Sequence, residues 1–228
     1  MSFNRLQREE VKDEAKGQAA IAVLEGERNT NKKFYKVEVD HMELCAKVEN
    51  HIEGNERLTR DVAAATAIAT EAHHGQADKA GRPYILHILR VARFMKTDRE
   101  KVVAYLHDVI EDSDFLEGDL RPIFHYEDVR DVMALTKYND ESYRDYIDRL
   151  VTHGSYTALR VKASDLFDHL SNPDKGQFMN DSRRDQYESA KFKITGRIEQ
   201  LEKEAEGIKN KAAQDEEMRR MTSPRYGA

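Results

Sequence analysis

The chain has 228 residues, of which 39% are hydrophobic and 35% are charged, so it is long enough to bury the core of one moderate domain with extensions. Its formal net charge of −6 gives no support for nucleic-acid binding, which requires a basic surface. No apolar run approaches the roughly 18 residues of a membrane span, the polar amino terminus does not resemble a secretory signal, and the lone Cys45 favours a reducing compartment. We therefore expect a cytoplasmic protein that neither crosses a membrane nor binds nucleic acid.

Residues 1–56 are predicted to form an extension ahead of the main domain. The first thirty residues are charged and poorly patterned, which is typical of a mobile or loosely docked arm. Residues 34–39 alternate weakly, as in a short strand. Helical spacing follows over residues 41–52, so a short helix is expected there.

Residues 57–175 are predicted to form the main domain, built from helices. Thr59 is expected to cap an alanine-rich helix that leads to His73. Pro83 suits the first turn of the next helix. The apolar face of that helix consists of Ile85, Leu89, Ala92 and Met95. Residues 113–118 read as a loop, and three further helices are expected at residues 128–137, 143–153 and 156–170.

Residues 176–228 are predicted to form a long charged helix, beginning near Ser182, and a tail. Apolar residues recur at heptad spacing along it: Tyr187, Ile194, Ile198, Leu201, Ala205, Ile208 and Ala212. This weak coiled-coil seam favours a packing stripe, with homo-oligomerisation through the helix as the alternative. Because strand signals are scarce, the predicted fold class is all-α.

The most informative segment is a predicted helix that carries His107 and Asp108 and, one turn later, Glu111 and Asp112. At about 100° per residue these four polar groups share one side of the helix, while the other side is almost wholly apolar. Burying unpaired charge costs several kcal/mol. A divalent metal ion with a water to activate is one ordinary way to hold such groups together.

Three further residues could complete this site. His73 stands where its helix ends, and Asp165 lies among apolar neighbours, so Asp165 needs a partner. His169 follows Asp165 by four residues and can face the same way. A set of two imidazoles and two carboxylates suits Mn²⁺, Fe²⁺ or Zn²⁺ better than Ca²⁺.

Other polar residues near these positions are given more ordinary roles. His74 and His87 are interpreted as surface or packing residues, and Asp168 as either a solvated carboxylate or a support for His169.

The sequence resembles the hydrolase domain of RelA/SpoT-type alarmone proteins over about residues 59–172. The matching motifs occur in the family order at residues 72–76 (AHHGQ), 81–87 (GRPYILH), 91–92 (VA), 106–113 (LHDVIEDS), 136–137 (TK) and 162–165 (KASD). Several ordered motifs are more specific than the general His-Asp (HD) pattern. The nearest kind is a small stand-alone (p)ppGpp hydrolase.

The resemblance implies a helical HD-domain fold that holds one Mn²⁺ and removes the 3′-diphosphate from (p)ppGpp, giving GDP or GTP and pyrophosphate. It implies metal ligands at His73, His107, Asp108 and Asp165, and a catalytic acidic pair at Glu111 and Asp112. The substrate-binding residues are predicted to be Lys79, Tyr84, Lys162 and His169.

Four positions depart from the family pattern. Asp78 replaces a customary Arg, His169 an Asn, Ile88 a Pro and Ser164 an Ala. A negative charge at residue 78 would change base or phosphate recognition. Two alternatives therefore stay open: a different nucleotide substrate, such as an adenosine alarmone, NADPH or a dNTP, or a catalytically idle module that senses a nucleotide or binds a protein.

Overall fold

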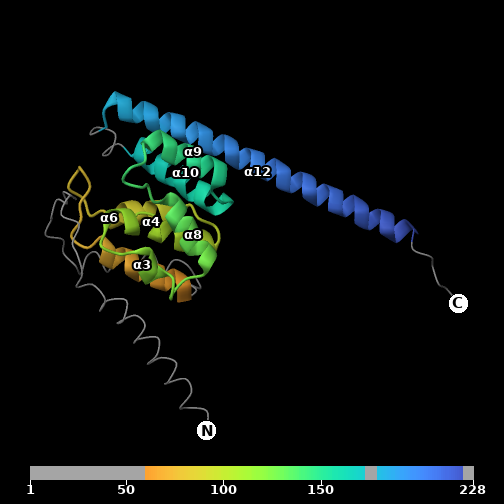
Figure 1. Ribbon diagram of the computed structural model, residues 1–228, viewed down its shortest axis with the longest axis horizontal. Helices are drawn as coiled ribbons and strands as arrows, with labels where there is room; N and C mark the ends of the chain where they lie inside the picture. The colour runs from red at the N-terminus through yellow and green to blue at the C-terminus, as the bar shows by residue number, and fades with distance from the viewer. Residues whose placement is uncertain (1–59, 173–178, 223–228) are drawn as a thin grey trace, which may run out of the picture.

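The computed structural model describes residues 60–172 and 179–222, and within those ranges the chain is helical with no strand (Figure 1). The helices are α3 (Arg60–Ala72), α4 (Ile85–Arg93), α5 (Asp98–Leu106), α6 (Val109–Asp112), α7 (Glu117–Leu120), α8 (Tyr126–Leu135), α9 (Tyr143–His153), α10 (Tyr156–Ser171) and α12 (Asp181–Thr222). The predicted all-α class is confirmed. The predictions for the arm, the strand at 34–39, the helix at 41–52 and the Thr59 cap lie outside the described residues.

The helices begin where the sequence supplies caps. The Thr97 hydroxyl accepts a hydrogen bond from the backbone N–H of Glu100, and the Glu100 carboxylate accepts one from the N–H of Thr97, which makes a capping box for α5. Ser142 and Ser155 cap α9 and α10 through their hydroxyls. These local signals explain why the helix bounds were predictable to within a few residues.

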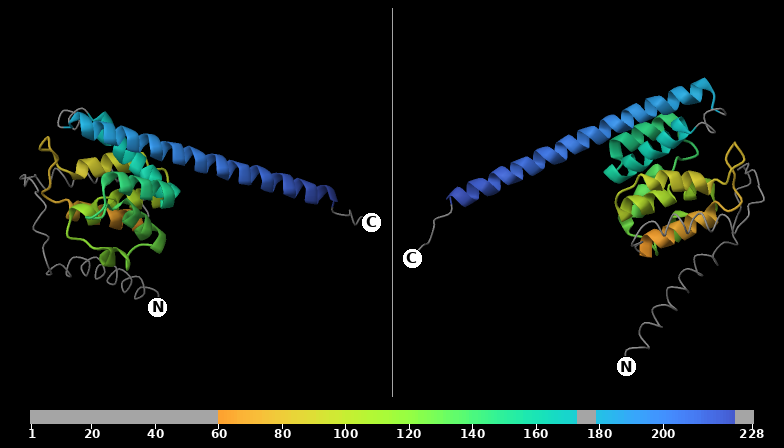
Figure 2. Two further views of the ribbon diagram at one scale, coloured as in Figure 1. Left: turned by 45° about the horizontal axis from the view of Figure 1, so that its top comes forward. Right: turned by 180° about the vertical axis from the view of Figure 1, so that it is seen from behind.

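Helix α5 lies at the centre of the bundle and packs against α3, α4, α8 and α10. Its side chains Val102, Val103 and Leu106 are buried. The apolar face predicted for α4, namely Ile85, Leu89, Ala92 and Met95, is also buried. Figure 2 shows α9, α10 and α12 forming a second layer over this group. The loop predicted at 113–118 is shorter than expected, because α7 begins at Glu117.

The predicted continuous helix through His107 and Asp112 is wrong. Helix α5 ends at Leu106, and α6 starts afresh at Val109, because Asp108 adopts a backbone conformation with φ −105° and ψ −4°. This is the sparsely populated bridge region in which many active-site residues lie. His107 and Asp108 therefore occupy a junction between two helices at the end of the central helix.

The first half of α12 packs on α10 and α9, and the second half projects away from the bundle (Figures 1 and 2). Ile194 is fully buried and Tyr187, Ile198 and Leu201 pack against the core, whereas Ile208 is 71% exposed. The early part of the predicted seam is thus intramolecular packing. The division of the chain into 1–56, 57–175 and 176–228 stays a prediction.

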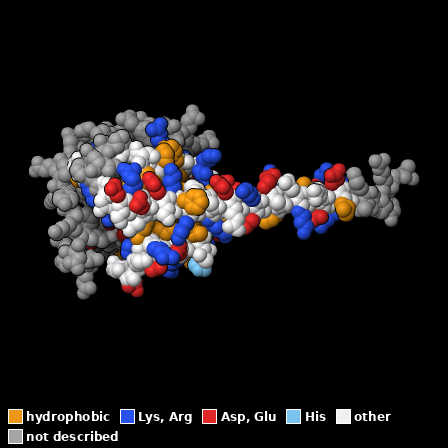
Figure 3. Space-filling view, turned by 90° about the horizontal axis from the view of Figure 1, so that it is seen from above, with side chains coloured by type: hydrophobic (Ala, Val, Ile, Leu, Met, Phe, Trp, Pro, Cys, Tyr) orange, Lys and Arg blue, Asp and Glu red, His pale blue; other side chains and the backbone are white. Residues whose placement is uncertain are grey.

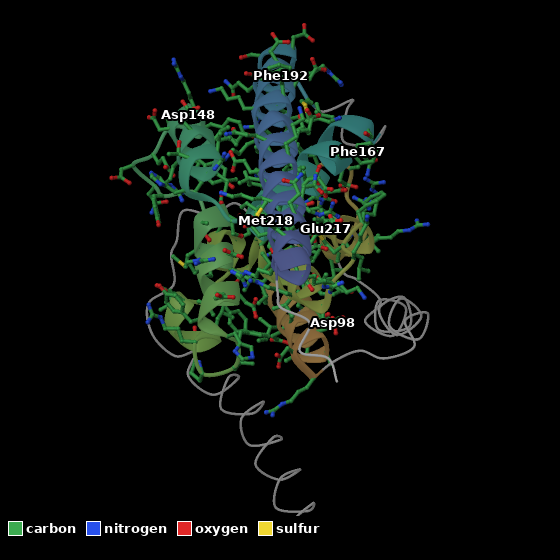
Figure 4. The ribbon with its side chains drawn as sticks, turned by 90° about the vertical axis from the view of Figure 1, so that its right-hand side faces the viewer. Asp98, Asp148, Phe167, Phe192, Glu217 and Met218 are labelled. Carbon is green, nitrogen blue, oxygen red and sulfur yellow. The ribbon has the colours of Figure 1, made fainter. Side chains whose placement is uncertain are left out.

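The projecting half of α12 carries interspersed positive and negative side chains (Figure 3). Helix α12 points towards the viewer in Figure 4, where Glu217 and Met218 lie near its end in front of the bundle; Figure 1 shows the same end of the helix projecting away from the bundle. In the described ranges, none of the helices has both the length and the apolar character needed to span a bilayer.

Candidate metal centre

Three histidine side chains are buried together at the ends of α3, α4 and α5. His73, His87 and His107 are each exposed by no more than 2%, and in each the Nε2 atom has no hydrogen-bond partner among the described residues. Each Nδ1 atom donates a hydrogen bond: His73 to Gln76 Oε1 at 2.9 Å, His87 to Asp168 Oδ2 at 2.7 Å, and His107 to the Ala104 carbonyl at 2.7 Å. Imidazoles that bind metals are held in this way, with Nδ1 anchored and Nε2 turned to the ion.

Gln76 holds its position through two further hydrogen bonds. Its Nε2 atom donates to the Ala72 carbonyl at 3.0 Å and to the Asp112 carbonyl at 2.7 Å, so its Oε1 atom faces His73. This amide orients His73 and ties the turn after α3 to the end of α6. The turn itself contains Gly75, whose φ of +70° favours glycine.

Two carboxylates meet these imidazoles. Asp108 Oδ2 lies 3.2 Å from His107 Nε2 and 3.7 Å from His87 Nε2, and it accepts a 2.6 Å hydrogen bond from the Tyr84 hydroxyl. Asp165 Oδ1, on α10, lies 3.2 Å from the Nε2 atoms of both His87 and His169. Two groups of potential ligand atoms result, each within 4.8 Å: His87 with His107 and Asp108, and His87 with Asp165 and His169.

Burial and charge act on these groups in opposite directions. Burial lowers the pKa of His73 to about 4, so this imidazole is neutral at pH 7. Burial also opposes the charged form of His107, but the Asp108 carboxylate outweighs it and raises the pKa to about 9. The pKa of Asp108 is correspondingly lowered, despite its burial. In the absence of a cation, a proton on His107 therefore partly neutralises this carboxylate.

Asp165 is paired with a lysine whose side chain is largely buried. Lys162 Nζ lies 2.8 Å from Asp165 Oδ2, and the ammonium also lies 5.2 Å from the ring centroid of Tyr146. Burial opposes ionisation of both groups, yet their mutual attraction lowers the pKa of Asp165 and raises that of Lys162. Oδ1 is left as the Asp165 oxygen that faces the imidazoles.

The predicted acidic pair borders the cluster from α6. Burial raises the pKa of Glu111, whose carboxylate accepts a 3.0 Å hydrogen bond from the backbone N–H of Lys137. Arg149 holds the loop that supplies this N–H, since its guanidinium donates to the Thr136 carbonyl at 3.0 Å and binds Glu141. Asp112 is half-buried, and its charge acts on Tyr84.

The four predicted substrate-binding residues are not gathered together. Tyr84 and His169 lie in the cluster, and their rings are 5.3 Å and 5.0 Å from the ring of His87. Lys162 is buried against Asp165. Lys79 is exposed in the turn before α4 and makes no ion pair with another described residue. Contact of any of these with a substrate stays a prediction.

The interpretation of His87 as a surface or packing residue is wrong, because its ring lies between Asp108 and Asp165. The signal in the sequence that could have placed His87 in the site was its position three residues after Tyr84, on the same helix face. Asp168 is not a solvated carboxylate either: it is buried, and it binds His87 and Arg90. His74 is exposed, as predicted.

The departures from the family pattern have local explanations. The Asp78 carboxylate accepts hydrogen bonds from the backbone N–H groups of Ala80 and Arg82 and pairs with the Arg82 guanidinium at 2.9 Å, so its charge is neutralised within its own turn. The Ser164 hydroxyl donates to the Val91 carbonyl at 3.1 Å. Ile88 is fully buried in the core.

Comparison with known proteins confirms the resemblance to RelA/SpoT-type hydrolases. The chain is 39% identical over 82 residues to a guanosine-3′,5′-bis(diphosphate) 3′-pyrophosphohydrolase of Vibrio cholerae, a match covering 34% of this chain and 12% of that protein. It is 37% identical over 82 residues to the bifunctional (p)ppGpp synthase/hydrolase SpoT of Escherichia coli, with the same coverage. The matches thus span about an eighth of the length of these curated relatives.

A solved structure shares the fold. It is described as a metazoan ortholog of SpoT that hydrolyses ppGpp and has a role in starvation responses. The two folds superpose with a TM-score of 0.53 at 22% sequence identity, over 63% of this chain and 88% of the other. No family model matches the chain.

Proposed function

We propose that this chain is a metal-dependent nucleotide phosphohydrolase that removes the 3′-diphosphate from (p)ppGpp. The observation that supports a bound metal is the pair of buried Nε2 atoms of His87 and His107, which have no hydrogen-bond partner among the described residues and lie 3.7 Å and 3.2 Å from Asp108 Oδ2. Such atoms are costly to bury unless something binds them. The choice of substrate rests on the similarity to named (p)ppGpp hydrolases.

The residues fit a divalent cation, which we propose is Mn²⁺ held by His87, His107, Asp108 and Asp165. The resemblance implies His73 in place of His87, but among the described residues His87, and not His73, is grouped with His107 and Asp108, and its Nε2 atom lies 3.2 Å from Asp165 Oδ1. Two nitrogen and two oxygen donors suit Mn²⁺, Fe²⁺ or Zn²⁺, and the family resemblance selects Mn²⁺. A cation bound there would neutralise phosphate charge and lower the pKa of a coordinated water towards neutrality.

The protein side chains would then supply orientation and proton transfer. Glu111, whose pKa is raised by burial, is the general base that takes the proton from the attacking water. The backbone N–H of Lys137 fixes the direction of its carboxylate. Tyr84 holds Asp108 through its hydroxyl, and Gln76 holds His73. Asp112 is proposed to share the proton-transfer role with Glu111.

The test is a nucleotide panel with the full chain, first treated with EDTA and then reloaded with Mn²⁺. We expect pyrophosphate and GDP from ppGpp, measured by ion-exchange chromatography, and little product from an adenosine alarmone, NADPH or dNTPs. His107→Gln is the paired control, and should lose turnover. Absence of pyrophosphate release from ppGpp would refute the proposal, and preferred hydrolysis of another nucleotide would reassign the substrate.

A further inference from the structure

We propose that Arg149, on α9, is a positioning residue for the general base Glu111 and acts through the peptide group that joins Thr136 to Lys137. This role for Arg149 rests on the proposed function. Among the described residues, Arg149 makes no hydrogen bond or ion pair with Glu111 itself. It reaches that carboxylate through one peptide group, whose two polar ends are held by Arg149 and by Glu111.

The peptide group after Thr136 leaves α8 and turns towards α6. Thr136 has an extended backbone with φ −75° and ψ 122°, so the N–H of Lys137 does not continue the hydrogen bonding of the helix. This N–H instead donates to Glu111 Oε2 at 3.0 Å. At the other end of the same peptide group, the Thr136 carbonyl accepts a 3.0 Å hydrogen bond from the Arg149 guanidinium.

A peptide group can transmit orientation because it is planar. In a trans peptide the C=O and N–H bonds point in opposite directions, and the described chain contains no cis peptide bond. Holding the carbonyl oxygen of Thr136 therefore fixes the direction in which the N–H of Lys137 points. A cationic donor on the carbonyl also polarises the group, which strengthens the hydrogen bond that its N–H donates to Glu111.

Arg149 is itself held firmly enough to act as an anchor. Its guanidinium binds the two carboxylate oxygens of Glu141 at 2.8 Å and 2.9 Å and donates to the Ala134 carbonyl at 3.2 Å. The ring centroids of Tyr138 and Tyr146 lie 4.6 Å and 5.4 Å from the guanidinium carbon. The Arg149 side chain is 25% exposed and that of Glu141 is 12% exposed, so water competes only weakly for these contacts.

The hydrogen bond from Lys137 matters to Glu111 because burial works against the ionised carboxylate. Burial raises the pKa of Glu111, and the N–H of Lys137 opposes this rise. With Oε2 held by that N–H, Oε1 is the oxygen directed to take a proton from water. A loop released from Arg149 would let the carboxylate rotate, and a displacement of about 1 Å can cost about 10²-fold in rate.

The first test is kinetic and uses the full chain with Mn²⁺ and ppGpp. Arg149→Gln should lower kcat by about 10- to 100-fold, with KM and metal content unchanged. Arg149→Lys should restore little of this loss, because an ammonium keeps the charge but cannot hold a carbonyl and a carboxylate in one planar fork. The matched control Arg144→Gln removes an arginine from the same helix whose side chain is 84% exposed, and it should retain the wild-type kcat.

A double-mutant cycle separates positioning from a general loss of structure. In the Glu111→Gln background, Arg149→Gln should have no further effect on kcat, because the group that Arg149 positions is already lost. Losses that multiply in the double variant, or a normal kcat in Arg149→Gln, would overturn the proposal. Circular dichroism checks folding, and if Arg149→Gln is unfolded, Glu141→Gln loosens the same guanidinium and takes its place in the cycle.

Exchange of the Lys137 amide hydrogen, followed by NMR, reports on the loop without turnover. It should be about 10- to 100-fold faster in Arg149→Gln than in the wild type, the factor expected for loss of one charge-assisted hydrogen bond. Unchanged exchange would overturn the proposal even in an active enzyme. Absence of ppGpp hydrolysis by the wild type would refute the proposed function instead, while the amide exchange would still decide whether Arg149 holds the loop.

Discussion

Replacing Lys162 with methionine tests how the buried charge of Asp165 is tolerated. The substitution keeps the length and apolar stem of the side chain but removes the ammonium that lies 2.8 Å from Asp165 Oδ2. The Lys162 side chain is 14% exposed and that of Asp165 is 4% exposed, so water cannot replace the lost partner effectively. The carboxylate is then left buried with imidazoles alone.

The magnitude follows from the separation of the charges. At 2.8 Å and an effective dielectric of about 20, two unit charges attract by about 6 kcal/mol. Part of this is offset because the variant no longer buries an ammonium. Breaking such a pair by removing one partner costs about 3–5 kcal/mol. For a chain of this size that corresponds to a fall in melting temperature of roughly 10 °C.

The assay is thermal unfolding followed by circular dichroism, with EDTA and then with Mn²⁺. We expect the full loss of stability in EDTA and a smaller loss with Mn²⁺, since a bound cation supplies positive charge to Asp165. The control Lys193→Met removes a half-exposed ammonium from α12 and should shift the melting temperature too little to resolve. A loss below about 1 kcal/mol in EDTA would refute the reasoning.

The contribution of the Lys162–Asp165 pair to the stability of the fold should decrease as the pH falls. Lys162 holds the pKa of Asp165 below its ordinary value, so the pair stabilises the fold fully above a pH of about 4. This stability is lost as the pH falls further and Asp165 becomes protonated. Without the ammonium, the pKa of Asp165 rises. The difference in stability between the wild type and Lys162→Met should therefore narrow as the pH falls towards 4.

Three further predictions concern the site and the long helix. Glu111→Gln should lower kcat for ppGpp by about 10²- to 10⁴-fold with unchanged metal content, and near-normal turnover would exclude Glu111 as the base. Cation binding at pH 7.5 should release about one proton, because Asp108 raises the pKa of His107 to about 9. Calorimetry in two buffers of different ionisation enthalpy measures this proton release. Binding heats that are the same in both buffers would contradict the prediction. Deleting residues 203–228 should leave the melting temperature within roughly 2 °C of the wild-type value, since the described part of this segment is exposed. A larger fall would show that the segment packs on the bundle. Light scattering would show whether the segment holds two chains together.

The helices were predictable because their signals are local. Ser142, Ser155 and the apolar face of α4 mark their elements within a few residues of sequence. The break at Asp108 was not predictable in this way, since nothing in the helical periodicity of residues 102–112 interrupts it. Its cause is tertiary: the Asp108 carboxylate meets Tyr84, His87 and His107, which come from other parts of the chain or from the junction itself.

The candidate site was predictable in its residue types but not in its arrangement. Carboxylates and imidazoles in an apolar setting indicated a metal, and the structure brings His107, Asp108 and Asp165 near one another around His87. The role of His87 depends on α10, some 80 residues further along, where Asp168 binds its Nδ1 atom. A contact between residues so distant in sequence leaves no pattern in a single chain.

Tyr84, Tyr143 and Tyr187 lie in or beside the candidate metal centre, so their fluorescence can report on cation binding. The chain contains no tryptophan, so its ultraviolet emission comes from tyrosine. Tyr84 is hydrogen-bonded to Asp108, and the ring of Tyr187 packs on that of His169. The ring centroids of Tyr143 and Tyr187 are 5.5 Å apart. Filling the centre alters the surroundings of these phenols directly, and ion uptake can therefore be followed by fluorescence without a label.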